Sequence, residues 1–524
     1  MPKVLVTEPL APEGLDLLRS ACEVVVKLKP TPDELAQLIA DCDALIVRSA
    51  TQVTAQVLQA GARLTVVGRA GTGVDNIDLD AATRRGVTVV NAPAANTVAV
   101  AEHTLALMLC MARHICQADS AMHAGKWQKQ GLMGIELRDK TLGLVGLGRV
   151  GSAVATRAVG FEMRVLAYDP FISPDKAAQM QVELAPLDKL LAQSDFISLH
   201  APLTERTRFL IGADELALVK PSAYLINCAR GELVDVEALV QALRARRLAG
   251  AALDVFAQEP CINPVLCECP NLLLTPHLGA STEEAQASAA MQVTREVLDV
   301  LQNRPPRYPV NTVALSSEEL AFIRPYVDLA MRLGKFYARF AENNLTHLEL
   351  TYAGDVTRHD TNLITAAALA GLLSEAVQEP VNLVNAPIIA REHGLVVSEV
   401  RISEAGDFTD LVTLRARTTT RERVLAGTVM RGQPHIVRVD DYWLDFVAAG
   451  SLLVTEHVEQ PGIIGQMGTF LGNAGVSISF VQVGRQARGG RGLMVMGLDD
   501  ALNDSLLEQL MTLPSIRSAR VVNL

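Results

Sequence analysis

The sequence predicts an α/β protein with two parallel-sheet domains, then a mixed α/β region, then a small βαββαβ domain. Three observations support this prediction. Short apolar runs alternate with helical patterns over residues 1–302, and a G-x-G-x-x-G motif lies between two of these runs, within residues 142–169. The chain of 524 residues is also too long for one ordinary domain.

Composition argues against several classes of protein. The formal net charge of −11 disfavours nucleic-acid binding. No apolar run reaches the roughly 18 residues that a membrane-spanning helix needs. The 8 cysteines at irregular spacing indicate reduced thiols and a cytoplasmic location. Cys261, Cys267 and Cys269 lack the spacing of a zinc site, so we expect no metal.

The first domain is predicted to be a small parallel sheet with helices. We expect strands at 3–7, 24–27, 44–47, 65–68 and 88–91, and helices at 13–20, 32–40, 55–60 and 80–85. A long helix follows from Asn96 or Thr97 to about residue 124, and His103 on it is interpreted as a core or interface histidine. A helix at 283–302 returns to this domain, and the proline-rich residues 303–309 mark its boundary. The domain therefore comprises residues 1–97 and 279–311.

The second domain, residues 98–278, is predicted to be Rossmann-like. A strand at 142–145 leads into Gly146, Gly148 and Gly151, a helix follows at 152–160, and a strand at 164–168 ends at Asp169. These glycines allow a tight turn, a close approach of a pyrophosphate and close helix packing, with the helix N-terminus facing the phosphates. A carboxylate at Asp169 accepts hydrogen bonds from a ribose diol and repels a 2′-phosphate, which favours NAD over NADP.

Three later strands of this domain are followed by residues that are candidates for catalysis. The runs 223–227, 250–254 and 271–275 lead to Arg230, Glu259 and His277. Ligands of open parallel sheets lie beyond the carboxyl ends of the strands, so these side chains are expected to converge. His277 could act as a general base that takes a hydroxyl proton, and Glu259 could hydrogen-bond to its imidazole ring. Arg230 could bind a substrate carboxylate.

The rest of the chain divides at residue 449. Residues 312–449 are predicted to be mixed α/β, with helices at 318–341 and 361–375 and strands near 412–417 and 425–430. Arg415, Arg417, Arg421 and Arg423 there either hold a small anion or form a solvated strand face. Residues 450–524 have strands at 451–457, 476–484, 493–498 and 519–522 and helices at 462–473 and 505–513, a ferredoxin-like order.

Several sequence blocks resemble the D-isomer-specific 2-hydroxyacid dehydrogenases. These are GLGRVG, NCARGELVD, ALDVFAQEP and PHLGAST, while IVRSAT and VGRAGTGVDNID resemble the branch that acts on 3-phosphoglycerate. The resemblance covers nearly the whole chain. It implies a cytoplasmic homotetramer whose last module is an ACT regulatory domain.

The resemblance also implies residue roles. Arg230, Glu259 and His277 match the catalytic residues of the family. Positions that contact the substrate are matched by Arg48, Arg69, Gly73 and Asn96. Positions that line NAD are matched by Thr72, Gly146, Gly148, Arg149, Val150, Gly151, Asp169, Cys228, Asp254 and Gly279. Ala201 departs from the family pattern, in which a threonine makes a minor cofactor contact.

In the last module, His457, Glu459 and Ser477 match positions that bind L-serine as an effector. The implied reaction is oxidation of 3-phospho-D-glycerate by NAD to 3-phosphooxypyruvate, which opens L-serine biosynthesis. Two alternatives remain open: a glyoxylate or hydroxypyruvate reductase, and an NAD-sensing regulator of the corepressor type.

Overall fold

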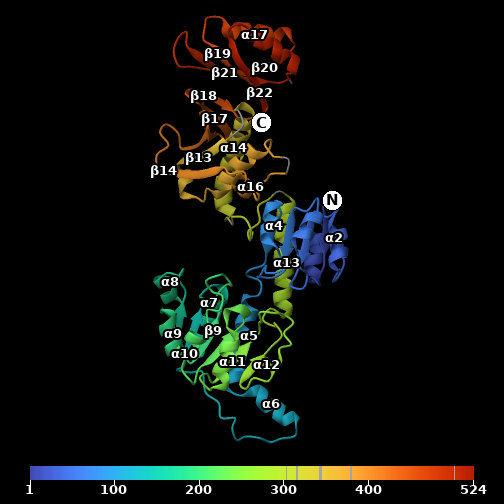
Figure 1. Ribbon diagram of the computed structural model, residues 1–524, viewed down its shortest axis with the longest axis vertical. Coiled ribbons are helices and arrows are strands. Elements are labelled where there is room, and N and C mark those ends of the chain that lie inside the picture. The colour runs from blue at the N-terminus through green and yellow to red at the C-terminus, as the bar shows by residue number, and fades with distance from the viewer. Residues whose placement is uncertain (303, 314, 316, 342–344, 378–379, 501) are drawn as a thin grey trace.

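The computed structural model describes residues 1–302, 304–313, 315, 317–341, 345–377, 380–500 and 502–524. Four sheets with their helices follow one another along an elongated molecule (Figure 1). Residues 451–523 lie at one end and the second parallel sheet lies at the other. The predicted boundary segment begins at Asn303, which lies outside the described residues.

The first sheet is parallel, with the order β2-β1-β3-β4-β5. Its strands are β1 (Lys3–Val6), β2 (Glu23–Val26), β3 (Ala44–Val47), β4 (Val66–Arg69) and β5 (Thr88–Asn91). Its helices are α1 (Pro12–Arg19), α2 (Pro32–Ile39), α3 (Ala55–Ala60), α4 (Leu79–Arg84) and the returning α13 (Glu283–Leu301). A Cβ at Gly68 would lie 2.6 Å from Val297 Cγ2, so this glycine lets α13 pack closely on β4.

The second sheet is also parallel, with the order β12-β11-β10-β9-β6-β7-β8. Its strands are β6 (Thr141–Val145), β7 (Arg164–Tyr168), β8 (Val182–Leu184), β9 (Phe196–Leu199), β10 (Tyr224–Asn227), β11 (Gly250–Leu253) and β12 (Leu272–Leu274). Its helices include α7 (Arg149–Gly160), α8 (Pro174–Gln179), α9 (Leu187–Gln193), α10 (Ala213–Leu218), α11 (Val236–Arg244) and α12 (Pro264–Cys267). The predicted Rossmann-like fold is confirmed. The short edge strand β8 is not among the predicted strands.

The predicted long helix is broken, and that prediction is wrong. Helices α5 (Thr97–Ala112) and α6 (Ile115–His123) meet at 66°. His114 has a left-handed backbone, with φ of 54°, and the Ala112 carbonyl accepts from Ile135 N–H over 2.9 Å instead of continuing the helix. Within the described residues no single helix has the length and hydropathy to cross a membrane. This bent pair meets that test only when its two helices are counted together.

The third sheet has the order β14-β13-β15-β16-β17-β18 and is antiparallel except between β13 and β14. Its strands are β13 (Leu345–Gly354), β14 (Val396–Ile402), β15 (Asp410–Thr418), β16 (Glu422–Met430), β17 (Gln433–Val439) and β18 (Tyr442–Val447). Its helices are α14 (Ser317–Phe340), α15 (Asn362–Leu373) and α16 (Ala386–Glu392). The Asn382 side chain donates over 2.8 Å to the carbonyl of Gly86, between α4 and β5, which ties this domain to the first one.

The arginine cluster on this sheet is already neutralised by carboxylates. Arg415 and Arg417 pair with Glu422 over 2.7 and 2.9 Å. Arg423 pairs with Asp440 over 2.6 Å, and Arg421 lies 3.8 Å from a carboxylate oxygen of Glu456. The structure therefore favours a paired strand face over a small-anion site.

The last sheet is antiparallel, with the order β20-β21-β19-β22, which confirms the ferredoxin-like prediction. Its elements are β19 (Ser451–Val458), α17 (Ile463–Asn473), β20 (Ile478–Arg485), β21 (Arg491–Leu498), α18 (Asp504–Met511) and β22 (Ile516–Asn523). Leu452, Leu493 and Val522 share one buried cluster with Phe336 and Phe446 of the third domain. The two domains therefore have a common core.

Candidate active site

A cleft of about 820 Å³ lies where the carboxyl edges of the first two sheets face each other. The first sheet contributes predicted substrate residues, and the second contributes the predicted catalytic residues. Both sets line the same cleft: Arg48, Arg69, Gly73, Asn96, Arg230, Glu259 and His277. Thr72, predicted as a cofactor residue, also lines it and donates its hydroxyl to Asn96 Oδ1 over 2.8 Å.

The glycine motif forms a cradle at the end of β6. Gly146 has φ of 97°, and a Cβ there would lie 2.8 Å from the His200 carbonyl carbon. A Cβ at Gly151 would lie 2.2 Å from Gly146 O, whereas Gly148 has open space around it. Helix α7 begins directly after Gly148, with Arg149 and Val150 in its first turn. The cradle therefore has the open backbone and helix N-terminus that fit a dinucleotide pyrophosphate.

Asp169 lies beside this cradle, held by backbone donors. Leu147 N–H donates to Asp169 Oδ2 over 2.8 Å, and Phe171 N–H donates to Oδ1 over 2.9 Å. Among the other predicted NAD positions, Cys228 follows β10 and Asp254 follows β11, and both are buried. Gly279 lies in the turn after β12 and donates to Asp254. All of them lie at the carboxyl edge of the second sheet.

His277 and Glu259 form a hydrogen-bonded pair. His277 Nδ1 lies 2.8 Å from Glu259 Oε2, and Phe256 N–H donates to Glu259 Oε1 over 3.0 Å. The carboxylate is thus fixed by the backbone and accepts the Nδ1 proton. This leaves His277 Nε2 available, and the side chain is 45% exposed to the cleft.

Two glycines make room for two guanidinium groups in the cleft. A Cβ at Gly71 would lie 1.9 Å from Arg69 Nη1, and one at Gly73 would lie 2.0 Å from Arg230 Nη2. Arg230 Nε also donates to Asp75 over 3.1 Å across the two domains. Asp75 is a site residue that the sequence patterns above do not single out, although it lies within the VGRAGTGVDNID block.

The cleft favours anions. Arg69 Nε is buried without a hydrogen-bond partner in the described structure. Burial, together with the nearby Arg230 charge, lowers the pKa of Arg69 to about 10, which leaves it charged at neutral pH. Arg48 is partly buried at the end of β3. Three guanidinium groups facing one cleft suit a ligand with more than one negative charge.

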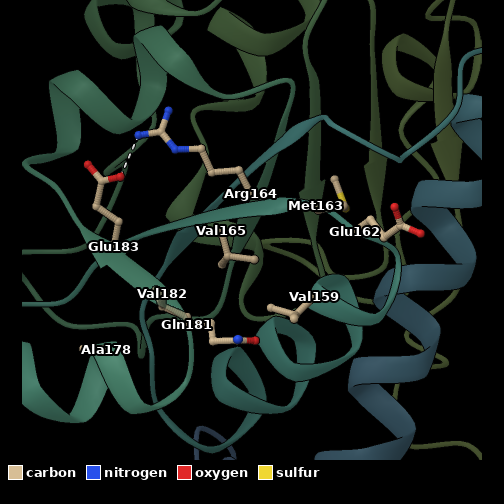
Figure 2. A pocket seen from close by; sticks show the side chains of 9 residues that line it. All are labelled: Val159, Glu162, Met163, Arg164, Val165, Ala178, Gln181, Val182 and Glu183. Carbon is tan, nitrogen blue, oxygen red and sulfur yellow. Dashed lines mark hydrogen bonds and ion pairs between the residues drawn. The ribbon is translucent and has the colours of Figure 1, made fainter.

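A second hollow lies on the opposite edge of the second sheet (Figure 2). Figure 2 shows it between the end of α7 and the starts of β7 and β8, with Arg164 and Glu183 joined by an ion pair of 2.6 Å. Ligands of this fold lie at the carboxyl ends of the strands, and this hollow lies at the amino ends. It is therefore not the dinucleotide cleft.

The predicted effector residues do not form one pocket within a chain. Glu459 lies just past the end of β19. Its carboxylate accepts hydrogen bonds from Arg485 Nη1 over 2.8 Å and from Gly489 N–H over 2.7 Å. The strand register places Ser477 at the other end of the sheet, roughly 30 Å away at the usual rise per residue. His457 is fully buried, and neither ring nitrogen has a partner in the described structure.

Comparison with known proteins defines the class first. Residues 105–279 match the D-isomer specific 2-hydroxyacid dehydrogenase NAD binding domain, which confirms the predicted NAD cofactor. Residues 322–440 match the D-3-phosphoglycerate dehydrogenase intervening domain. The TT0316 protein of Thermus thermophilus has a similar structure, with a TM-score of 0.55 and 38% identity over 59% of this chain and 99% of that one.

Relatives that match over the whole of this chain then define the family more narrowly. The chain is 43% identical to D-3-phosphoglycerate dehydrogenase of Synechocystis sp., over 100% of this chain and 95% of that one. It is 40% identical to the enzyme of that name from Methanocaldococcus jannaschii, over 100% of both. The chain belongs to the D-3-phosphoglycerate dehydrogenase family.

Proposed function

We propose that the protein oxidises 3-phospho-D-glycerate to 3-phosphooxypyruvate with NAD, the reaction that opens L-serine biosynthesis. The observation that carries this proposal is the single cleft shared by the His277–Glu259 pair and three arginines from two domains. Turnover of 3-phosphohydroxypyruvate with NADH tests it, and no turnover with NADH still bound would contradict it.

In this proposal the second domain holds NAD through the glycine cradle, Asp169, Cys228, Asp254 and Gly279. When bound, NAD supplies the acceptor for the hydride that leaves C2 of the substrate. His277 Nε2 takes the hydroxyl proton, because its Nδ1 is already bonded to Glu259. The Glu259 carboxylate then stabilises the imidazolium that forms.

Arg230 holds the substrate carboxylate and polarises the neighbouring C–O bond. In the structure its Nε donates to Asp75, so the substrate carboxylate competes with that contact. Arg48 and Arg69 hold the phosphate, with Gly73 and Asn96 shaping the cleft between the domains. Such a division of charges fits a substrate that is anionic at both ends.

Replacing Arg69 with Gln is expected to raise the KM for 3-phosphohydroxypyruvate about 10–100-fold, because a charge-assisted contact is lost. The KM for unphosphorylated hydroxypyruvate should change much less. Arg48→Gln should act in the same direction, whereas Arg63→Gln is a matched control because Arg63 pairs with Asp43 outside the cleft over 2.8 Å. Steady-state kinetics with both substrates measures this. Equal rises in both KM values would favour the alternative, a glyoxylate or hydroxypyruvate reductase.

We further propose that the protein is a cytoplasmic homotetramer that L-serine inhibits. Helix α6 buries none of its side chains, and the neighbouring Trp127 and Met133 are 86% and 90% exposed, as in a segment that a second copy covers. Glu459 and Ser477 lie at opposite ends of one sheet, so a ligand that touches both must lie between two copies. The 8 cysteines have free thiols, which suits the cytoplasm.

Titrating L-serine into the NADH assay is expected to lower the rate, because the serine ammonium group replaces Arg485 on Glu459. A Glu459→Gln variant should lose this response and keep the rate measured without serine. Light scattering during gel filtration should give a mass above the 56.2 kDa of one chain. A rate that stays flat through millimolar serine, or a monomer, would contradict the effector assignment.

A further inference from the structure

Asp254 holds the segment that carries His277 in place through hydrogen bonds. The Thr275 hydroxyl and the Leu278 N–H donate to Asp254 Oδ1 over 2.6 and 2.8 Å, and the Gly279 N–H donates to Oδ2 over 2.8 Å. The His277 N–H donates to the Asp254 carbonyl over 2.9 Å. One buried residue therefore binds the chain on both sides of the imidazole.

His277 needs such support because of its backbone. Its φ of 55° lies in the left-handed region, which is unfavourable for a residue with a Cβ. A conformation of this kind persists where the surroundings over-determine it. The direction in which the His277 ring faces the cleft therefore depends on the contacts made by Asp254.

His103, on α5, contacts Asp254 and Thr275 from a different element. Its Nε2 lies 3.2 Å from Asp254 Oδ1 and 3.3 Å from Thr275 Oγ1. The Thr275 hydroxyl gives its single proton to Asp254, so its oxygen is only an acceptor toward His103. His103 Nε2 therefore carries a proton and donates it toward both oxygens. This explains the residue better than the predicted role of a core or interface histidine.

The electrostatics of the network agree with this assignment. Burial acts to raise the pKa of Asp254, but the hydrogen bonds from His103, Thr275, Leu278 and Gly279 outweigh it, and the net pKa is lowered. Cys228 Sγ lies within 4.8 Å of the ligand atoms of His103 and Asp254. Burial raises the pKa of the Cys228 thiol to about 12, so the thiol stays neutral. The carboxylate of Asp254 is thus an anion surrounded by donors.

The network also lies at both crossings of the chain between the first two domains. Helix α5 leads from β5 to the second sheet, and residues 277–282 lead back to α13. Gly279 fits between them, because a Cβ there would lie 3.2 Å from Asp254 Oδ2 and 3.4 Å from Val100 on α5. His103 therefore joins the outgoing segment to the returning one.

We propose that His103 is a positioning residue for the reaction, which through Asp254 and Thr275 sets the direction of the His277 imidazole toward the substrate hydroxyl. The proposal rests on the proposed function, in which His277 takes the hydroxyl proton. His103 itself does not contact the reacting atoms in this scheme.

Replacing His103 with Leu is expected to lower kcat about 10–100-fold, the effect of misplacing a catalytic group by a fraction of an ångström to an ångström. The solvent deuterium isotope effect on kcat should rise, because proton transfer to a misplaced imidazole becomes slower relative to the other steps. His103→Gln, whose amide nitrogen reaches the place of Nε2, should keep kcat within about threefold of the unaltered enzyme.

The matched control is Glu102→Gln, because Glu102 is the neighbouring residue on α5 and its side chain is 64% exposed. Hydrogen–deuterium exchange should speed up in residues 275–281 of the His103→Leu variant and not in the control. If the Leu variant fails to fold, Thr275→Val removes the Thr275 contacts with His103 and Asp254, leaves the His103–Asp254 contact, and should also raise the isotope effect.

An unchanged isotope effect in the His103→Leu variant, or a Gln variant as slow as the Leu variant, would overturn the positioning role. Exchange in residues 275–281 that matches the unaltered protein would overturn it too. The exchange measurement needs no turnover. If the unaltered protein is inactive with 3-phosphohydroxypyruvate, the proposed function is contradicted. The exchange measurement still tests the hydrogen-bond network of His103, Asp254 and Thr275 in that case.

Discussion

Replacing His277 with Asn is expected to lower kcat by roughly 10²–10⁴-fold, the usual contribution of a positioned general acid or base. The Asn side-chain amide takes the place of Nδ1 and keeps the bond to Glu259, which spans 2.8 Å in the structure. The variant lacks Nε2, the nitrogen that is proposed to take the hydroxyl proton. NADH oxidation with 3-phosphohydroxypyruvate measures the loss.

The binding of NADH is the control for this variant, because the glycine cradle and Asp169 lie away from His277 along the sheet edge. The dissociation constant from NADH fluorescence should change by no more than about threefold, within the effect of a surface substitution. A variant that still turns over at the normal rate would exclude the proton-transfer role. That outcome would mean that another group takes the hydroxyl proton, whereas an unaltered protein that binds NADH without any turnover would favour the NAD-sensing regulator.

Replacing Arg230 with Gln is expected to lower kcat/KM by roughly 10²–10³-fold, because a preorganised charged donor to the substrate carboxylate and carbonyl is lost. Arg230→Lys should recover little of this loss, since an ammonium group cannot make two parallel hydrogen bonds to a carboxylate. Steady-state kinetics in the reduction direction gives the value.

Asp75→Asn is the informative companion to Arg230→Gln. It removes the negative charge that now holds Arg230 Nε over 3.1 Å, while the guanidinium stays in place. The KM for 3-phosphohydroxypyruvate should therefore fall or stay level. A loss as large as that of Arg230→Gln would mean that the ion pair, rather than the free guanidinium, is required for activity.

Much of the site is predictable from the sequence because parallel sheets place the ends of their strands at one edge. Arg230, Glu259 and His277 each follow a strand of the second sheet, and the structure brings all three to the cleft. The bond between His277 Nδ1 and Glu259 needs only that convergence. Arg48 and Arg69 are predictable for the same reason from the first sheet.

Other features depend on contacts between distant parts of the chain. Edge strand β8 is three residues long, too short for a periodic pattern. The helix break at His114 depends on Ile135 binding the Ala112 carbonyl from the following loop. The separation of Ser477 from Glu459 follows from strand register, which is set by pairing across the sheet rather than by residue types.

The sequence by itself determined the order of the four domains, the dinucleotide cradle and the residues able to transfer a proton or bind an anion. These follow from local patterns: apolar periodicity, glycine spacing and the residue types that follow each strand. Only the tertiary structure decided the Arg230–Asp75 contact between domains and the link from His103 to Asp254. Those pairs are separated by more than a hundred residues, and side-chain contacts over such distances arise from packing that no local pattern records.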